Sequence, residues 1–280
     1  MDLSVIIVSW NVRGRLRECL RSVLSDAMSL RAEIFVVDNA SNDGTVQMMA
    51  EEFPQIKLII NKENVGFARA NNQAMDFAQG KYILLLNPDT KILAGALDGM
   101  VKFMEVSPRA GVAGCHLVDE EGETVPSARR FPGVWDQSLL ILKLPHLAPA
   151  LLDGYLMKDF DYEKSAEVDS VRGSFFMIRR EVVQKIGGLD ERYFVWFEEV
   201  DYCQQVKKSG WQVMYTPVVK CIDYVGASFG QLKTFEKQKM FTESLLKYFK
   251  KWQPGWQYGV LFCLRPIGLA AAWLAQFFKL

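Results

Sequence analysis

The first hundred residues alternate short apolar segments with segments in which apolar side chains recur at helical spacing. The apolar segments cover residues 3–9, 33–38, 56–60 and 82–86. The first of them is apolar almost throughout, which is typical of a strand buried on both faces of its sheet. Helical spacing follows each strand, over residues 16–24, 46–53, 66–79 and 95–106. This alternation predicts an α/β fold with a mainly parallel central sheet flanked by helices.

Each of these strands ends in a polar segment. The four segments are Ser9-Trp10-Asn11, residues 38–43, residues 61–66 and Asn87-Pro88-Asp89. The carboxyl ends of parallel strands meet at one sheet edge, which is where open α/β proteins bind ligands. Asp89 brings a carboxylate to that edge, and Mg²⁺ is commonly held by one or two carboxylates together with phosphate oxygens. Asn-Pro-Asp alone is ordinary turn chemistry, but the four segments together predict a nucleotide site.

The second half of the chain is less regular. Predicted strands cover residues 111–117, 171–179 and 211–215, and a predicted helix covers residues 198–209 and is closed by Gly210. Residues 121–169 are rich in turn residues and are expected to shape a pocket wall or a lid. A chain of 280 residues can bury a large core. We expect one large domain over residues 1–230 and a helical tail over residues 231–280.

The composition excludes several classes of protein. Half of the residues are apolar, and 33 basic residues balance 33 acidic ones. This balance argues against a disordered chain and against a protein that binds nucleic acid through bulk positive charge. The five cysteines are far apart and only two histidines are present, so a structural zinc site is disfavoured. Scattered cysteines are typical of buried side chains in a reducing compartment. We expect no signal peptide and a location on the cytoplasmic side.

The C-terminal region has a different character. Residues 259–278 are mostly apolar but are interrupted by Arg265-Pro266, and Lys247, Lys250 and Lys251 precede them with Trp252 and Trp256. A spanning helix needs about 20 apolar residues, and a central arginine costs about 2.5–3.5 kcal/mol on insertion. We therefore favour an interfacial helix on the inner membrane surface, anchored by tryptophan and lysine. The alternative is a helix that packs on the large domain or on a dimer partner.

Further polar motifs follow the first four segments in a fixed order. They are residues 187–191 (Gly-Gly-Leu-Asp-Glu), residues 198–203 (Glu-Glu-Val-Asp-Tyr-Cys) and Gly210-Trp211. Taken together, the motifs resemble the inverting family 2 glycosyltransferases with the GT-A fold, especially the rhamnosyltransferase-like branch, over residues 3–230. The resemblance implies transfer of a hexose from a nucleoside diphosphate donor, with dTDP-L-rhamnose favoured. The implied acceptor is a cell-surface polysaccharide or its lipid-linked precursor.

The resemblance assigns the donor to the residues at the strand ends. An aspartate such as Asp38 can accept a hydrogen bond from N3–H of uracil or thymine, and Ser9, Asn11 and Asp43 would hold the base and ribose hydroxyls. A turn-capping role for Asp38 is the alternative. Gly66 would allow close approach of the backbone to the nucleotide. The complete expected donor set is Ser9, Asn11, Asp38, Asn39, Ser41, Asp43, Asn64, Gly66, Asn71 and Asn87.

The implied cofactor is Mg²⁺ or Mn²⁺. Asp89 matches the last acidic position of the family's DxD motif, and Asn87 replaces the first. The family usually has a histidine ligand six residues after the proline that is Pro217 here. Asp223 takes that place, ahead of Gly226-Ala227-Ser228. Aspartate is a hard oxygen ligand, but it would also add negative charge beside a diphosphate, so a surface-turn role for Asp223 stays open.

The resemblance places the catalytic base at the predicted helix start. The family's Glu-Asp pair is Glu198-Glu199 here, which assigns the base to Glu199 with Glu198 as its rival. Asp201 is expected to cap or brace the helix on the acceptor side.

Other residues are expected on the acceptor side as well. Arg129 and Arg130 are expected to meet a phosphate-bearing acceptor. Trp196 and Trp135 are candidates for stacking on a sugar face.

Two other functions remain as alternatives. A sugar nucleotidyltransferase shares the sheet and the metal-binding aspartate, but it would need a basic glycine-rich segment after the first strand. Residues 9–14 do not provide such a segment. A catalytically silent nucleotide-binding protein is favoured only by the departures from the family pattern at Glu199 and Asp223.

Overall fold

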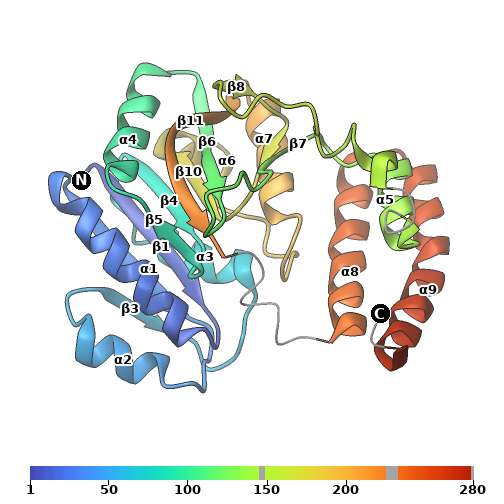
Figure 1. Ribbon diagram of the computed structural model, residues 1–280, viewed down its shortest axis with the longest axis horizontal. Helices are drawn as coiled ribbons and strands as arrows, with labels where there is room; N and C mark the ends of the chain where they lie inside the picture. Colours follow the sequence, from blue (N-terminus) through green and yellow to red (C-terminus); the bar gives the residue numbers. More distant parts are fainter. Residues whose placement is uncertain (145–148, 225–232, 279–280) are drawn as a thin grey trace.

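The first four strands form a parallel sheet. The computed structural model describes residues 1–144, 149–224 and 233–278. The four strands are β1 (Leu3–Ser9), β2 (Ala32–Asp38), β3 (Lys57–Ile60) and β4 (Tyr82–Leu86). They pair in parallel in the order β3-β2-β1-β4 (Figure 1), which confirms the parallel sheet expected for this part of the chain. Ser9 lies opposite Asp38, so the polar ends of β1 and β2 are neighbours.

The chain after β4 adds strands of mixed direction to the same sheet. They are β5 (Thr90–Ile92), β6 (Ala110–Val118), β8 (Ala166–Glu167), β10 (Phe175–Arg179) and β11 (Gln212–Asp223). Strand β10 runs antiparallel to both β4 and β6, whereas β11 runs parallel to β6 and antiparallel to β5. A separate two-stranded ladder joins β7 (Ala128–Arg129) to β9 (Ser170–Val171).

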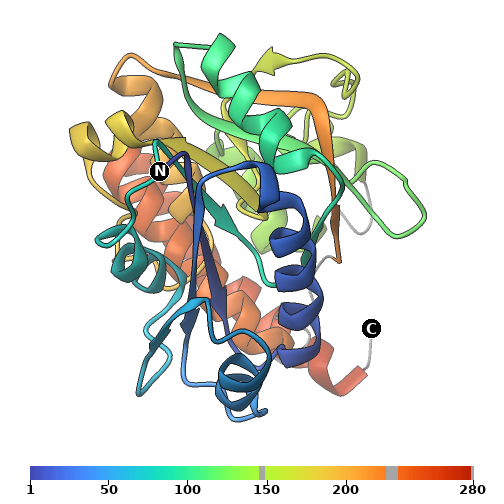
Figure 2. The same ribbon diagram turned by 90° about the vertical axis from the view of Figure 1, so that its left-hand side faces the viewer.

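Helices cover both faces of the sheet. One face carries α1 (Arg13–Asp26), α2 (Thr45–Glu52) and α4 (Ala96–Val106), and the other carries α3 (Phe67–Met75), α6 (Arg180–Ile186) and α7 (Glu198–Lys208). In Figure 2, α1 and α4 lie in front of the strands. Val5 and Ile7 of β1 belong to the core under α1, and Ile6 and Val8 belong to the core under α3. Burial on both faces explains why the first strand is apolar throughout.

Two predicted strands differ from the structure. The strand expected over residues 171–179 is interrupted at residues 172–174, because β9 pairs with β7 outside the main sheet while β10 enters it between β4 and β6. The strand expected to end at Tyr215 continues to Asp223, with an irregular register between Thr216 and Lys220. Pro217 lies inside this irregularity and has no N–H to donate to a ladder. The helix expected over residues 66–79 ends earlier, at Met75.

The turn-rich region of the chain carries little regular structure. It holds β7, β8, a short helix α5 (Val134–Ile141) and a 3₁₀ turn (Pro149–Leu152). Four of the five cysteines are buried, as expected, but the expectation is wrong for Cys263, which is exposed.

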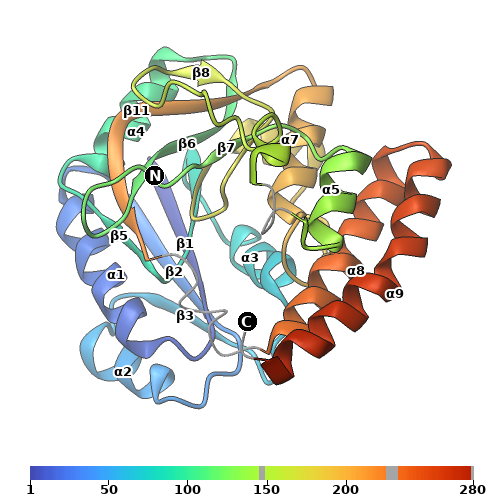
Figure 3. The same cartoon turned by 45° about the vertical axis from the view of Figure 1, so that its right-hand side comes forward.

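The C-terminal residues form a hairpin of two helices, α8 (Thr234–Trp252) and α9 (Gly255–Phe278). The hairpin lies to one side of the sheet with α5 beside it (Figures 1 and 3). Its core contains Leu245 and Phe249 of α8, Leu261 of α9 and Phe197, which directly precedes α7. The hairpin therefore packs on the segment that leads into α7.

Candidate active site

A pocket of about 740 Å³ opens at the carboxyl ends of β1, β2 and β4. Val8 of β1 and Trp10, which follows that strand, line it together with Asn39, which follows β2. Residues 87–89, which follow β4, line it as well. Met240 of α8 lines the pocket too, so the C-terminal hairpin borders it. The volume is in the range of small-molecule binding sites, and the location is the sheet edge that the sequence predicts.

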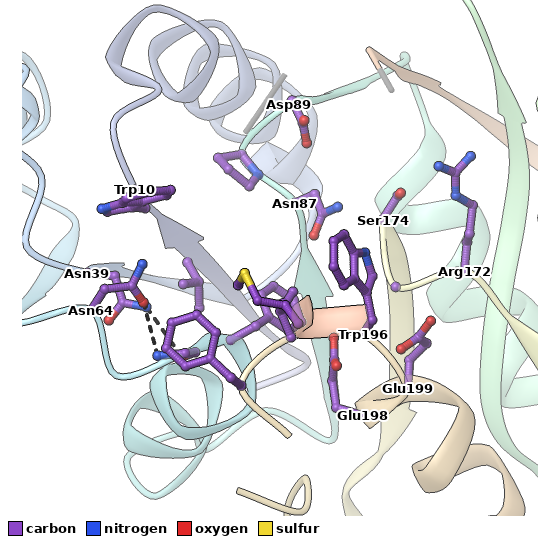
Figure 4. Close-up of a pocket in the computed structure, with 18 of the residues that line it drawn as sticks. Trp10, Asn39, Asn64, Asn87, Asp89, Arg172, Ser174, Trp196, Glu198 and Glu199 are labelled. Atoms are coloured by element: carbon purple, nitrogen blue, oxygen red, sulfur yellow. Dashed lines mark hydrogen bonds between the residues drawn. The ribbon is translucent and has the colours of Figure 1, made fainter. Parts of the chain in front are cut away.

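An amide network holds one wall of the pocket. Asn39 Nδ2 donates to Asn64 Oδ1 at 3.0 Å and to the carbonyl oxygen of Gly66 at 3.3 Å, and Figure 4 shows the two asparagine side chains side by side. Asn61 Nδ2 donates to Asn39 Oδ1 at 3.0 Å. These bonds fix the end of β2 to the segment that begins α3, so Asn39, Asn64 and Gly66 line the pocket together.

Gly66 is required at its position by two separate constraints. Its φ is +86°, a conformation that side chains rarely adopt. A Cβ placed on it would also lie 2.6 Å from the carbonyl oxygen of Phe194. Phe67 N–H donates to that same oxygen at 2.7 Å. The segment before α3 is therefore pressed against the segment before α7.

Four other residues of the expected donor set, Ser9, Asn11, Asp38 and Ser41, do not line the pocket. Asp38 Oδ2 accepts a bond from Ser41 N–H at 3.0 Å, which is the turn-capping role, while Asp38 Oδ1 is buried with no hydrogen-bond partner among the described residues. Ser9 Oγ is buried in the same way. Asn11, at a φ of +52°, accepts a bond from Asn42 N–H at 2.8 Å through Oδ1, and its own N–H donates to Ser41 Oγ.

Asp43 and Asn71 make local contacts in the structure. Asp43 accepts bonds from the N–H groups of Arg13, at 2.8 Å, and Thr45, at 3.1 Å, so it holds the starts of α1 and α2 together. These bonds lower the pKa of Asp43 despite its partial burial, which acts in the opposite direction. Asn71 donates to the carbonyl oxygen of Phe67 at 2.9 Å within α3. Neither residue lines the pocket.

Two buried carboxylates, Asp89 and Asp223, line the pocket where β11 pairs with β5. They are 4% and 3% exposed. Asp223 lies opposite Thr90 in the antiparallel ladder, and Tyr224 N–H donates to the carbonyl oxygen of Asp89 at 3.0 Å, so the two aspartates belong to neighbouring strand ends. Ser174 Oγ donates to Asp223 Oδ2 at 2.7 Å.

This oxygen-rich pair suits a hard divalent cation. No group of three or more His, Cys, Asp or Glu side chains gathers for a metal within the described parts of the chain. Mg²⁺, however, typically takes only one or two protein carboxylates and completes its shell with water and phosphate oxygens. Asp89 and Asp223, with Asn87 beside them in the pocket wall, match that pattern. The motif Gly226-Ala227-Ser228 lies outside the described residues.

Glu198 and Glu199 begin α7 and line the pocket. In Figure 4 they lie on one side and Asn87 and Asp89 on the other, with Trp196 between them. The Oε2 atoms of both glutamates are buried and have no hydrogen-bond partner among the residues that the structure describes. Buried carboxylate oxygens are usually hydrogen-bonded in folded proteins, and a catalytic role is one of the explanations for an exception.

The two glutamates differ in electrostatic surroundings. Burial, reinforced by the charge of Glu199, raises the pKa of Glu198 well above its usual range. Burial also raises the pKa of Glu199, but backbone hydrogen bonds and the charges of Arg129 and Arg172 act against that rise. Of the pair, Glu199 is therefore the better placed to carry the negative charge.

The backbone before α7 is strained. Trp196 and Phe197 have φ values of +62° and +69°, which non-glycine residues adopt rarely and at a cost of about 1–3 kcal/mol each. The conformation directs Trp196 into the pocket wall and Phe197 into the core shared with Phe241 and Tyr248 of α8. Ser244 of α8 also donates to the carbonyl oxygen of Val195 at 2.7 Å. The hairpin thus holds the strained segment in place.

Asp201 lies away from the pocket, fully buried between α7 and α8. Its carboxylate accepts bonds from Lys251 Nζ at 2.8 Å, Trp252 Nε1 at 2.6 Å and Gln205 Nε2 at 2.7 Å. These contacts brace the helix that begins with Glu198.

Only one of the two neighbouring arginines expected on the acceptor side lines the pocket. That residue is Arg129, whereas Arg130 is exposed. Trp196 lines the pocket as well, but Trp135 is 75% exposed.

The pocket lining includes polar and flexible side chains that the sequence-based set lacks, among them Arg172, Ser174 and Met240. Arg172 and Ser174 were hidden inside a segment read as one continuous strand, and Met240 comes from the tail. Arg172 Nη1 lies 3.6 Å from Asp223 Oδ2, an ion pair rather than a tight hydrogen bond. The signal that could have found Arg172 is Gly173, which interrupts an otherwise apolar strand.

Residues 4–187 match the family described as glycosyl transferase family 2. The N-acetylglucosaminyl-diphospho-decaprenol L-rhamnosyltransferase of Mycobacterium tuberculosis is 26% identical over 240 residues, which cover 82% of this chain and 78% of that protein. Rhamnosyltransferase WbbL of Escherichia coli is 27% identical over 168 residues, which cover 57% of this chain and 61% of that protein.

Solved structures resemble the fold. The mannosyltransferase PcManGT from Pyrobaculum calidifontis, in complex with GDP-Man and Mn²⁺, has a TM-score of 0.60 at 20% identity over 98% of this chain and 73% of its own. GalNAc-T7 with UDP, GalNAc and Mn²⁺ has a TM-score of 0.60 at 16% identity over 80% of this chain and 44% of its own. These likenesses confirm the GT-A fold. Because the family match spans well over half of the sequence, the chain belongs to glycosyl transferase family 2 and is a glycosyltransferase similar to rhamnosyltransferases.

Proposed function

We propose that this protein transfers a sugar from a nucleoside diphosphate to an acceptor hydroxyl with inversion at the anomeric carbon. The observation that supports the proposal is that two sets of carboxylates lie on different sides of one pocket. Asp89 lies on one side, where a departing diphosphate would need positive charge, and Glu198 and Glu199 lie on the other. Asp223 lies on the strand end that pairs beside Asp89. An in-line displacement needs a leaving-group side and a base side that face each other across the sugar.

The donor nucleotide would bind at the ends of β1 and β2. Asp38 Oδ1, buried without a hydrogen-bond partner among the described residues, supports an acceptor role toward N3–H of uracil or thymine. The other oxygen of Asp38 already caps the turn, so the two roles coexist. The relatives named for rhamnose transfer favour dTDP-L-rhamnose as the donor. Asn39, Asn64 and Gly66 would form the wall under the nucleotide.

Asp89 and Asp223 would hold Mg²⁺ or Mn²⁺, with the side-chain oxygen of Asn87 in reach of the metal or the ribose. When bound, such an ion supplies positive charge that offsets the charge developing on the leaving diphosphate. The two similar structures that were solved with Mn²⁺ support a divalent cation. Ser174, by donating to Asp223 Oδ2, would orient that carboxylate.

Glu199 would act as the general base. The acceptor oxygen attacks the anomeric carbon, its proton passes to a carboxylate oxygen of Glu199, and the bond from the anomeric carbon to the diphosphate breaks with its electron pair. Glu198, whose pKa burial raises further, would stay protonated and offer a hydrogen bond. Asp201 would not contact the substrates; it would act by bracing α7.

The acceptor would be a saccharide of a cell-surface polysaccharide or its lipid-linked precursor. The name of the mycobacterial relative, which denotes a diphospho-decaprenol acceptor, supports the lipid-linked form. Arg129 and Arg172 line the pocket near Glu199 and could meet a phosphate of such an acceptor. Trp196 offers an aromatic face to its sugar. We place the enzyme in the cytoplasm, at the inner face of the membrane that holds such an acceptor.

The direct test measures release of TDP, UDP and GDP from a panel of nucleotide sugars, with and without Mn²⁺. Turnover of dTDP-L-rhamnose with a polyprenyl-diphospho-sugar acceptor is the expected result, with the new glycosidic bond opposite in anomeric configuration to the donor. Nucleotide binding without turnover of any donor would mean a silent binding protein. Release of inorganic diphosphate from a nucleoside triphosphate and a sugar phosphate would mean a nucleotidyltransferase.

A further inference from the structure

Helix α9 has an outward face that is apolar from residue 255 to residue 276. Trp256, Val260, Ile267 and Leu274 are spaced by four, seven and seven residues, which places them in one line along a helix. They are 59%, 37%, 56% and 50% exposed. Phe262 and Trp273, at 55% and 51%, flank that line. Every exposed position of α9 between residues 255 and 276 is uncharged.

The single charged residue of α9 within the described range is turned inward. Arg265 Nη2 donates to Glu243 Oε1 of α8 at 3.0 Å, and Arg265 Nε donates to Thr242 Oγ1 at 3.2 Å. The inward face also holds Leu261 and Ala272, both fully buried. Length and composition alone would let residues 255–276 cross a membrane. These inward contacts with α8, however, would all break if α9 left the hairpin to cross one.

The hairpin concentrates positive charge in a chain that is neutral overall. Residues 233–278 carry six lysines and Arg265 against two glutamates, whereas the whole chain has a net charge of +0. Lys239 and Lys250 are exposed positions of α8, the helix that lies beside α9 in Figures 1 and 3. Lys247 instead donates to the carbonyl oxygen of Arg192, and Lys251 is paired with Asp190 and Asp201, so these two lysines serve the large domain. A second copy docking on this face would bring the same excess of positive charge, whereas an anionic lipid surface would offset it.

We infer that the outward face of α9 lies in the headgroup region of an anionic phospholipid bilayer, with the helix parallel to the surface. Large apolar side chains with tryptophan toward both ends, and lysines alongside, are the features by which interfacial helices bind such surfaces. Helix α8 contributes Met240 to the pocket, so a hairpin seated on the bilayer holds the pocket close to the lipid. The inference names the surface that brings the proposed lipid-linked acceptor to the site, but lipid binding itself does not depend on that function.

The test is flotation of the full chain with phosphatidylcholine vesicles that contain phosphatidylglycerol. We expect the wild type to float with these vesicles, to float less as salt rises, and to float poorly with pure phosphatidylcholine. Ile267→Glu and Trp256→Glu should each weaken binding at least about tenfold. Phe77→Glu is the matched control, because Phe77 is a 65% exposed apolar residue outside the hairpin. It should bind like the wild type.

Three results would overturn the inference. The first is unchanged flotation of Ile267→Glu, and the second is a wild type that fails to float. The third is resistance of the membrane-bound protein to alkaline extraction, which would mean a spanning helix. If Ile267→Glu instead turns a dimer into a monomer without changing flotation, the face is an interface between copies. Nucleotide release measured with a water-soluble acceptor in the same variants separates this inference from the proposed function, since that activity needs no bilayer.

Discussion

Asp201 Oδ2 lies 2.8 Å from Lys251 Nζ, although 50 residues separate the two in the sequence. The first belongs to the helix that begins with Glu198 and Glu199, and the second to the last turn of α8. Asp201 has no exposed surface, and Lys251 also reaches Asp190 at 2.9 Å. The contact ties the C-terminal hairpin to the first turn of α7.

Removal of one partner should leave a buried charge without compensation. We expect Lys251→Met to lower the free energy of unfolding by about 3 kcal/mol and to reduce turnover because α7 loses its brace. Urea denaturation and donor turnover measure the two effects. Lys158→Met is the control, since the side chains of Lys158 and its partner Asp153 are 66% and 39% exposed, and it should change stability by less than about 0.5 kcal/mol. Equal stability of the two variants would contradict the bracing role.

Alanine substitutions at three glycines should distinguish the cost of backbone strain from the cost of steric contact. Gly66→Ala meets both a positive φ and the oxygen of Phe194, and should destabilise by about 2–3 kcal/mol with loss of nucleotide affinity. Gly95→Ala meets only the positive φ of +79° in open space and should cost about 1 kcal/mol. Gly14→Ala, in α1 with nothing near, should stabilise by about 0.5–1 kcal/mol. Thermal unfolding gives the order, and any other order would refute the packing described for Gly66.

Metal removal should abolish turnover. We expect a chelator to stop nucleotide release and added Mn²⁺ to restore it. Asp89→Asn should lower kcat at least about 100-fold, because the leaving diphosphate loses its charge stabilisation. Asp223→Asn should raise the Mn²⁺ concentration needed for half-maximal rate. If Asp223→Asn leaves the metal dependence unchanged, Asp223 only positions Ser174 and Arg172.

The pH dependence of kcat/KM should report the base. Because burial raises the pKa of Glu199, the acidic limb of the profile should lie above the usual range of a glutamate, and activity should fall as the pH drops through that raised pKa. Arg129→Met removes a positive charge that favours the carboxylate, so the limb should move to higher pH. Arg130→Met, at the exposed neighbour, should leave the limb in place. A shift to lower pH for Arg129→Met would contradict the electrostatic arrangement.

The parallel half of the sheet could be predicted from the sequence because each of its strands and helices is marked by a local pattern of apolar residues. A continuous apolar strand followed by helical spacing can be recognised within about twenty residues. The strand-end motifs fall on one edge because the carboxyl ends of parallel strands meet there. In this way Asn39, Gly66, Asn87 and Asp89 were found. The antiparallel insertion of β10 between β4 and β6 was not accessible, because pairing between strands about ninety residues apart leaves no local periodicity.

The pocket residues that lie in strand-end motifs could be predicted from the sequence. Those that tertiary contacts bring to the pocket could not. Arg172 reaches the pocket only because β9 leaves the main sheet to pair with β7. Met240 reaches it because the tail folds back over α7, which no pattern within residues 231–280 specifies. Asp201 was expected to cap or brace its helix, but its partners, Lys251 and Trp252, lie some fifty residues away in a different helix.

The most direct measurement compares kcat for Glu199→Gln and Glu198→Gln under saturating donor and acceptor, with TDP affinity measured alongside. We expect Glu199→Gln to lower kcat by about 10²–10⁴ while TDP binds as it does to the wild type. Burial raises the pKa of Glu198, and we propose that its carboxyl stays protonated, so Glu198→Gln, which substitutes an amide of similar shape, should retain most of the activity. Full activity of Glu199→Gln together with loss in Glu198→Gln would contradict the assignment of the base.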